Sequence, residues 1–364
     1  MDPFTVGVDN PVMTMRMLVL AAILVAGLEL EAQTSTQRTA PAGVLVGIHT
    51  LGGYTFAAGP PVPDSLRTVW LDTDGSATPA LPRLLVPRSS GFWWLGLNSA
   101  CSEEPRERLD DGVTQMEIEI RDALWSSPID ASPIPRAHDA EWNCRSDDVF
   151  CENDFRTGID WVWPDFISIS KSGEYGCGAH SDGDHRPEVH RLDDLESPLT
   201  VGAVFGPSVE ARLRREYERA KREYRSRHRE DGCDDPDGFS PTAWHVELQG
   251  GRWLLEGWAD THRLCEVGVD YAADVDVSRM TGTRPTQRLL PSSLSGVKDA
   301  MTSADGRWIL LIREHEVALS PREAPDKTIA RAPLTTVDYV VMAEWAQGRN
   351  VARWRDQVRK LAEP

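Results

Sequence analysis

The sequence predicts an α+β fold in which antiparallel β-sheets are combined with a long surface helix and a C-terminal helix. Short runs of alternating apolar and polar residues recur along the chain, separated by Gly, Pro and Asp-Gly turn signals that are typical of hairpins. Two other segments, about 208–230 and the last fifteen residues or so, carry apolar residues at helical spacing. A β-propeller-like arrangement of the same hairpins is the alternative.

The same patterns divide the chain into regions. Residues 33–42 form a flexible leader, 43–126 a β-rich N-terminal region, and 127–160 a polar loop that carries two cysteines. Residues 161–277 are expected to form an α+β domain, joined by a linker at 278–296 to a β-hairpin and C-terminal helix at 297–364.

Both predicted helices are amphipathic. The apolar residues of the first helix form a narrow stripe: Val209, Leu213, Tyr217, Ala220 and Tyr224. Its arginines and lysines are interleaved with glutamates, which indicates a solvated surface and not a nucleic-acid-binding helix. The C-terminal helix places four apolar residues on one face: Val351, Trp354, Val358 and Leu361.

The first 32 residues read as a leader with a secretory signal peptide. A short apolar run, Met17–Leu28, follows one basic residue and precedes small and polar residues. The run is shorter than the about 20 apolar residues of a membrane-spanning helix, so no transmembrane anchor is expected. The protein is therefore predicted to be secreted or periplasmic. The residues before the run carry two aspartates where a signal peptide has a basic region, so Met13 and Met15 are candidates for the natural start as well as Met1.

The composition indicates a globular and strongly acidic protein. Of the 364 residues, 40% are hydrophobic and 26% are charged, and the formal net charge is -18. A field of this sign repels phosphate backbones, so nucleic acid is not an expected partner, whereas cationic proteins are attracted to it. The thirteen tryptophans are expected to fill the core; the alternative is a sugar-stacking platform built from Trp93 and Trp94 or from Trp161 and Trp163.

Six cysteines in an exported chain predict up to three disulfides. There is no C-x-x-C pair, which removes the main support for a zinc ribbon or thioredoxin-type redox chemistry. The short polar loop "CRSDDVFC" makes Cys144 and Cys151 the favoured pair, and the pairing of the others stays open. The remaining candidates are Cys101, Cys177, Cys233 and Cys265.

The stretch "FISISKSGEYGCGAHSDGDHRPEVHRL" is dense in side chains that bind metals or take part in catalysis. Its candidate metal ligands are His180, Asp182, Asp184, His185 and His190. Asp, Gly and Pro also set tight turns, so a structural turn is the favoured interpretation, and no metal or other cofactor is expected. Ser168 and Lys171 match S-x-x-K, but the alternating strand pattern points them to opposite faces.

This stretch resembles the extracellular domain of lysozyme-sensing anti-sigma factor receptors, which also occurs beside some peptidoglycan deacetylases. The resemblance covers about residues 161–277. Tyr175, Gly178, Ala179 and His180 match a Tyr-x-Gly-Gly-Ala-His turn, although Cys177 replaces a glycine. A second segment leads into a helix and matches at Leu199, Val201, Val204 and Phe205, with Ala203 where the family has aspartate. The resemblance implies that the turn is structural and that it carries no catalytic residue.

These observations favour an exported binding or sensing protein of the cell envelope over an enzyme. The expected ligand is a cationic protein such as a muramidase, or an envelope polysaccharide. The acidic residues of the cysteine loop are the expected contacts: Asp147, Asp148, Glu152 and Asp154. The alternatives are a secreted metal-dependent hydrolase that uses the His180–His190 cluster, and a structural envelope protein.

Overall fold

The structure is a computed structural model, and residues Ala42–Pro364 form one compact unit. The described residues are 42–52, 64–105, 116–130, 149–177, 180–228, 235–249, 252–260, 268–274 and 296–363. The predicted signal peptide, almost all of the flexible leader and almost all of the 278–296 linker lie outside these residues. Within them, no helix is both long and apolar enough to cross a membrane.

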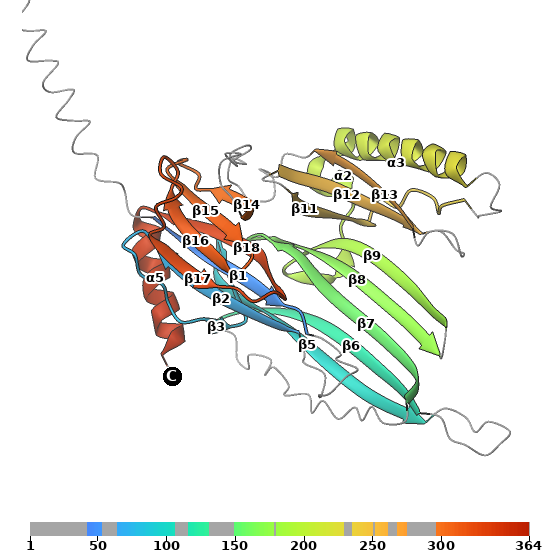
Figure 1. The fold of residues 1–364 in the computed structure, drawn as a ribbon, viewed down its shortest axis with the longest axis horizontal. Helices are drawn as coiled ribbons and strands as arrows, with labels where there is room; N and C mark the ends of the chain where they lie inside the picture. The colour runs from blue at the N-terminus through green and yellow to red at the C-terminus, as the bar shows by residue number, and fades with distance from the viewer. Residues whose placement is uncertain are drawn as a thin grey trace, which may run out of the picture. The chain divides into compact units, whose positions relative to one another are not determined.

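The described residues form four sheets that are almost entirely antiparallel, accompanied by few helices (Figure 1). The α+β prediction is therefore confirmed, and the series of small meander sheets also agrees with the propeller-like alternative. The sheets have the strand orders β18-β1-β2-β3, β10-β9-β8-β7-β6-β5-β4, β11-β12-β13 and β14-β15-β16-β17.

The first sheet joins the two ends of the described chain. Strand β1 (Ala42–Thr50) pairs with β2 (Ser65–Asp72) on one side and with β18 (Asp338–Gln347) on the other, while β3 (Leu81–Pro82) pairs with β2 (Figure 1). The run "GVLVGIH" is apolar throughout because β1 packs against a separate hydrophobic cluster on each face: Val44 and Val46 belong to one, and Leu45 to the other.

The second sheet has seven strands and crosses the region boundaries expected from the sequence. It contains β4 (Leu84–Arg88), β5 (Gly91–Pro105), β6 (Met116–Pro128), β7 (Val149–Val162), β8 (Phe166–Cys177), β9 (His180–Arg191) and β10 (Asp194–Pro198). Residues 127–160 were expected to be a loop, but β7 begins at Val149 and pairs with β6 in parallel and with β8 in antiparallel. Pairing on both sides satisfies the backbone of this polar segment, which has no clear alternation of its own.

The third sheet carries the long helix. Strands β11 (Trp244–Gln249), β12 (Arg252–Asp260) and β13 (Gly268–Asp274) pack beneath α3 (Pro207–Arg227), which follows the short helix α2 (Val201–Phe205) (Figure 1). Leu213, Tyr217 and Tyr224 of the predicted stripe are buried. The helix starts at Pro207 because Gly206, with φ +90°, breaks the chain direction before it.

The fourth sheet confirms the predicted hairpins near the C-terminus. It consists of β14 (Val297–Thr302), β15 (Trp308–Arg313), β16 (Glu316–Pro321) and β17 (Ala330–Pro333). The last helix, α5 (Arg349–Ala362), buries Val351, Trp354 and Val358. Its Arg355 reaches the buried carboxylate of Asp72 on β2 at 2.6 Å, which ties the helix to the first sheet.

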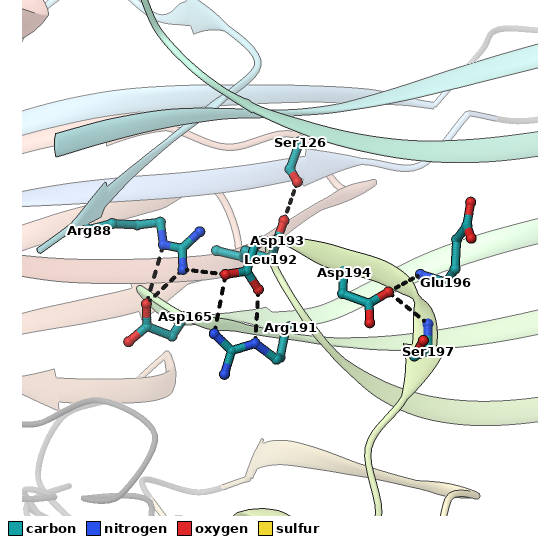
Figure 2. A network of polar contacts seen from close by, with 9 residues as sticks. All are labelled: Arg88, Ser126, Asp165, Arg191, Leu192, Asp193, Asp194, Glu196 and Ser197. Atoms are coloured by element: carbon teal, nitrogen blue, oxygen red, sulfur yellow. Dashed lines mark hydrogen bonds and ion pairs between the residues drawn. The ribbon is translucent and has the colours of Figure 1, made fainter. Parts of the chain in front are cut away.

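Two turns of the seven-stranded sheet are held by one arginine (Figure 2). Arg88 at the end of β4 lies 3.0 Å from Asp165 in the β7–β8 turn and 3.5 Å from Asp193 in the β9–β10 turn. Its guanidinium stacks over the ring of Trp93 at 4.4 Å. The network fixes the C-terminal end of β7, close to Asp160, which lines a cavity.

Candidate functional site

A cavity of about 510 Å³ lies where three other sheets meet the C-terminal end of β7. Strands β11, β14 and β18, each at the edge of its own sheet, line it together with β7 and the end of β1. The volume falls within the range of about 300–1,000 Å³ that is usual for ligand sites. The side chains used below are Leu51, Asp160, His245, Glu247, Lys298, Arg313, Glu314, Asp338, Tyr339 and Val341.

Three β-bulges fall on the lining of this cavity. Asp160 has no partner in the β7–β8 register, Lys298 has none between β14 and β15, and Val341 has none between β1 and β18. A bulge turns a side chain away from the direction that regular pleating would give it, and bulges are frequent beside functional sites. The cavity wall is therefore built from the irregular positions of three strands.

The bulge at Asp160 directs its carboxylate into a polar cluster. Asp160 accepts hydrogen bonds from Ser170 Oγ at 2.8 Å and from Ser168 Oγ at 3.3 Å, and it lies 3.0 Å from His245 Nδ1. The other ring nitrogen, His245 Nε2, lies 3.4 Å from Glu256, its cross-strand partner on β12. The imidazole is thus held between two carboxylates.

This arrangement keeps His245 charged. Burial alone would lower its pKa, but the hydrogen bonds and negative charges of Asp160 and Glu256 raise the pKa of His245 to about 10. The hydrogen bond from His245 also keeps the pKa of Glu256 below its usual value. At neutral pH the centre of the cluster is an imidazolium flanked by two carboxylates.

Glu247 is the carboxyl of the cluster whose pKa is raised. Burial, together with the charge of Glu256, raises the pKa of this half-buried carboxyl, and the two glutamates are hydrogen-bonded. Both nitrogens of His245 are already occupied by Asp160 and Glu256. Among the described residues, Glu247 therefore has no cation of its own.

The hydrogen bonds argue against a serine hydrolase. Ser168 and Ser170 both bond to Asp160, whereas a catalytic serine has to bond to the imidazole. A histidine that is charged at neutral pH is also a poor general base. The described residues contain no group of three or more side chains suited to a metal ion. The hydrogen bonds of the cluster stabilise the charged forms of His245 and Glu256, as expected for a binding site for charged groups.

The mouth of the cavity is apolar. Across the described residues, the large hydrophobic side chains that stand out to solvent are Leu51 at 38%, Val337 at 46% and Tyr339 at 54% exposure. Leu51 and Tyr339 line the cavity, and Leu51 N donates to Val337 O at 3.0 Å, so the three lie together. Exposed apolar side chains that gather at one cavity indicate a binding surface.

Other charges at the cavity are largely paired. Asp338 is bound by Arg67 at 2.7 Å and by the amide of Thr335 at 2.6 Å, and these contacts lower its pKa against the effect of burial. Arg313 is paired with Glu316 at 2.5 Å. Lys298 and Glu314 are exposed at the same end of the β14–β15 pair, where Val297 is the partner of Arg313.

The predicted metal-ligand cluster is stretched along strand β9. His180 pairs with Cys177 and His190 with Ile167, at the two ends of the strand. At about 3.3 Å per residue these histidines lie roughly 30 Å apart, too far to share an ion. His190 is buried and lies 2.9 Å from Glu188, which also binds Lys171 at 2.7 Å. Burial opposes these contacts, yet they lower the pKa of Glu188 to about 2.

For the other three predicted metal ligands, the structure describes the positions in strand β9 and not the side chains. Asp182, Asp184 and His185 lie in β9 opposite Tyr175, Gly173 and Ser172. Gly178 and Ala179 of the predicted structural turn lie outside the described residues. Ser168 and Lys171 follow the strand prediction: Ser168 is buried, and Lys171 is exposed.

The predicted contact loop lies partly outside the described residues and partly in strand β7. Asp147, Asp148 and Cys144 lie outside the described residues, so the Cys144–Cys151 pair stays a prediction. Glu152 and Asp154 lie in the backbone of β7. The α-carbons of Cys151 and Cys177 are direct partners across β7 and β8, and Cys101 lies in β5. Cys233 and Cys265 are also outside the described residues.

Sequence reasoning missed the residues that form the cavity cluster. Asp160, His245 and Glu247 are single polar residues inside apolar strands, and no motif joins them. The available signal was local: "WHVEL" places His245 and Glu247 two residues apart, on the same face of one strand. Asp160, 85 residues earlier in the chain, gives no indication of belonging with them.

Comparisons with known proteins yield structural neighbours only. No family model and no curated protein matches the chain. A solved DUF3298 family member from Bacteroides fragilis aligns with 51% of this chain and 92% of its own length, at 10% identity and TM-score 0.30. A DUF3298 family protein from Pseudomonas aeruginosa PAO1 aligns with 50% and 84%, at 14% identity and TM-score 0.25. Likeness at this level assigns neither a family nor a function to this chain.

Proposed function

We propose that this chain is an exported binding protein of the cell envelope and that its ligand is a cationic protein, with a muramidase as the first candidate. One observation carries the proposal: the exposed apolar side chains Leu51, Val337 and Tyr339 gather at the mouth of a cavity whose interior holds Asp160, Glu247 and His245. Exposed apolar side chains that gather in one place indicate a binding surface, and charged groups beside them can fix the orientation of a partner.

The charge of the chain supports a cationic ligand. The net charge of -18 attracts a basic partner over a long range. Beside the cavity, the carboxylates of Asp160 and Glu256 flank one imidazolium and leave the cluster with a net negative charge, to which ionisation of Glu247 adds. The sequence resemblance to lysozyme-sensing receptors points to the same class of ligand.

The other candidate functions have less support. A metal-dependent hydrolase would need His180 and His190 to converge, and both lie on one extended strand. The tryptophans considered for a sugar-stacking platform are not free to stack: Trp161, Trp163 and Trp94 are 3%, 0% and 6% exposed, and the guanidinium of Arg88 lies over the ring of Trp93. Tyr339 alone does not make such a platform. A purely structural role gives no reason for an apolar rim on an open cavity.

Calorimetric titration with a cationic muramidase tests the proposal directly. Binding should weaken as the salt concentration rises, because exposed charges are screened over about 10 Å at 0.1 M salt. A Val337→Ser/Tyr339→Ser variant should weaken binding by about tenfold or more if the rim forms the centre of the interface. Both side chains are about half exposed, so the variant is expected to fold.

Two further variants locate the contact. Glu323→Gln, at an exposed position between β16 and β17, is the matched control and should bind like the wild type. Neutralising Asp147, Asp148, Glu152 and Asp154 tests the loop that the sequence favours. Failure of the wild type to bind the muramidase at low salt would refute the proposed ligand. Unchanged affinity of the rim variant would refute the proposed surface.

A further inference from the structure

We infer that the cavity receives a lysine or arginine side chain of the protein ligand, that Glu247 is its acceptor, and that binding releases the proton that Glu247 shares with Glu256. The inference rests on the proposed function and identifies the chemistry of recognition. It begins with the position of Glu247, on edge strand β11 and on the lining of the cavity.

Glu247 differs from the other carboxylates of the cluster in its partners. Asp160 has His245 and two serines, Glu256 has His245, and Asp338 has Arg67. Glu247 is hydrogen-bonded to another carboxyl, that of Glu256, and the charge of His245, which Asp160 and Glu256 already share, acts on it without a hydrogen bond. A ligand cation would supply the missing charge and would allow both glutamates to be ionised.

The groups that face Glu247 come from three strands. His245 precedes it on β11, Glu256 lies diagonally across on β12, and Asp160 reaches the same cluster from β7. His245 is already shared between Asp160 and Glu256. Lys298 of β14 lines the same cavity but forms no contact with Glu247 among the described residues, and it is exposed.

The form of the cavity favours a long basic side chain over a free ion. Lysine and arginine combine an apolar stem with a charged head, and Leu51 and Tyr339 offer apolar surface along the entrance. An arginine can also stack on the ring of Tyr339. Guanidinium and ammonium groups form their strongest hydrogen bonds with carboxylates, which Glu247 provides when it is ionised.

A proton must leave when the cation binds. A hydrogen bond between two carboxyl groups needs one proton, so the Glu247–Glu256 contact holds a proton in the free protein, whereas in the complex both carboxylates accept hydrogen bonds from protein or ligand. The proton passes to the buffer, so the affinity should rise with pH until Glu247 is ionised in the free protein as well. Calorimetry in buffers of different ionisation enthalpy measures the number of protons released.

The experiment uses two ligands and two variants of the full chain. The ligands are the cationic muramidase and Nα-acetyl-arginine methylamide, with the uncharged citrulline analogue as a matched control. The variants are Glu247→Gln, which keeps the shape of the side chain, and Glu323→Gln, which removes an exposed carboxyl that does not line the cavity. Melting temperatures report whether each variant is folded.

Glu247→Gln should weaken both basic ligands by about tenfold and abolish proton release, and Glu323→Gln should leave both properties near the wild-type values. The citrulline analogue should not bind. If the muramidase binds but Glu247→Gln changes neither affinity nor proton release, the inference is wrong and the proposed function stands. If only the arginine compound binds, in a Glu247-dependent manner, the proposed ligand is wrong and the cation site stands. If the arginine compound does not bind and muramidase binding is independent of Glu247, the inference is overturned.

Discussion

Between about pH 6.5 and pH 10 the free energy of unfolding should fall more steeply for the wild-type protein than for a His245→Gln variant. His245 has a pKa of 6.5 when it is unperturbed and about 10 in the native protein, where Asp160 and Glu256 hold it. In this range the native state keeps a proton that the unfolded state has lost. Stability from the imidazolium is therefore complete below about pH 6.5 and is lost as the pH rises through 10.

The structure sets the size of the effect. The separation of the two pKa values, at about 1.36 kcal/mol per pKa unit, gives an upper limit of about 5 kcal/mol. The side chains of His245, Asp160 and Glu256 keep 17%, 18% and 22% of their exposure, so solvent screens part of the interaction. We therefore expect about 2–3 kcal/mol of this stability to be lost between the two pH values.

Urea unfolding followed by tryptophan fluorescence at about pH 6, 8 and 10 measures the loss. Other groups also titrate in this range, so the informative quantity is the difference between wild type and variant at each pH. His315→Gln, at an exposed position between β15 and β16, is the matched control. Parallel pH profiles for the wild type and His245→Gln would refute the assignment of a charged, doubly bound imidazole.

Three further predictions concern single sites. Burial raises the pKa of Glu344 to about 8, although the residue keeps some exposed surface, so stability should fall between about pH 5 and 8. Glu344→Gln should remove this loss and raise the melting temperature at about pH 9 relative to the wild type. Arg355→Ala should cost about 3 kcal/mol in urea unfolding, because it leaves the fully buried carboxylate of Asp72 without its cation; a cost below about 1 kcal/mol would contradict this. The register of β7 and β8 offers Cys177 as an alternative partner for Cys151 to the Cys144 favoured by the sequence, and non-reducing peptide mapping should find Cys151 bonded to Cys177; a peptide that joins Cys151 to Cys144 would overturn this alternative and support the pair favoured by the sequence.

Local patterns in the sequence predicted most of the secondary structure. Alternation and turn residues identified the β11–β12 and β14–β15–β16 hairpins, since the partners in each are adjacent in sequence. Helical spacing identified α3 and α5 and their buried residues. These elements are determined over ten to twenty residues, so a single sequence is enough to identify them.

The pairing of distant strands and the site itself required the structure. β1 pairs with β18, and nothing in "GVLVGIHT" indicates that partner. The bulge at Asp160 depends on how β7 pairs with β8, and its contact with His245 depends on how β11 packs beside them. The residues from His180 to His190 suggested a metal site because they are close in sequence, but an extended strand separates such residues in space.

The pairing of β1 with β18 also constrains how the protein is made. Thr50 bonds to Asp338, a residue 288 positions later, and Val44 and Leu45 pack on both faces of a strand that β18 completes. A ribosome that has released the first 300 residues has therefore not yet supplied the strand that closes this sheet. Because contacts of such long range form slowly, β1 must wait, with its apolar faces incompletely covered, until synthesis is nearly finished. A chain that has to be threaded through a membrane before it folds would gain time from this delay.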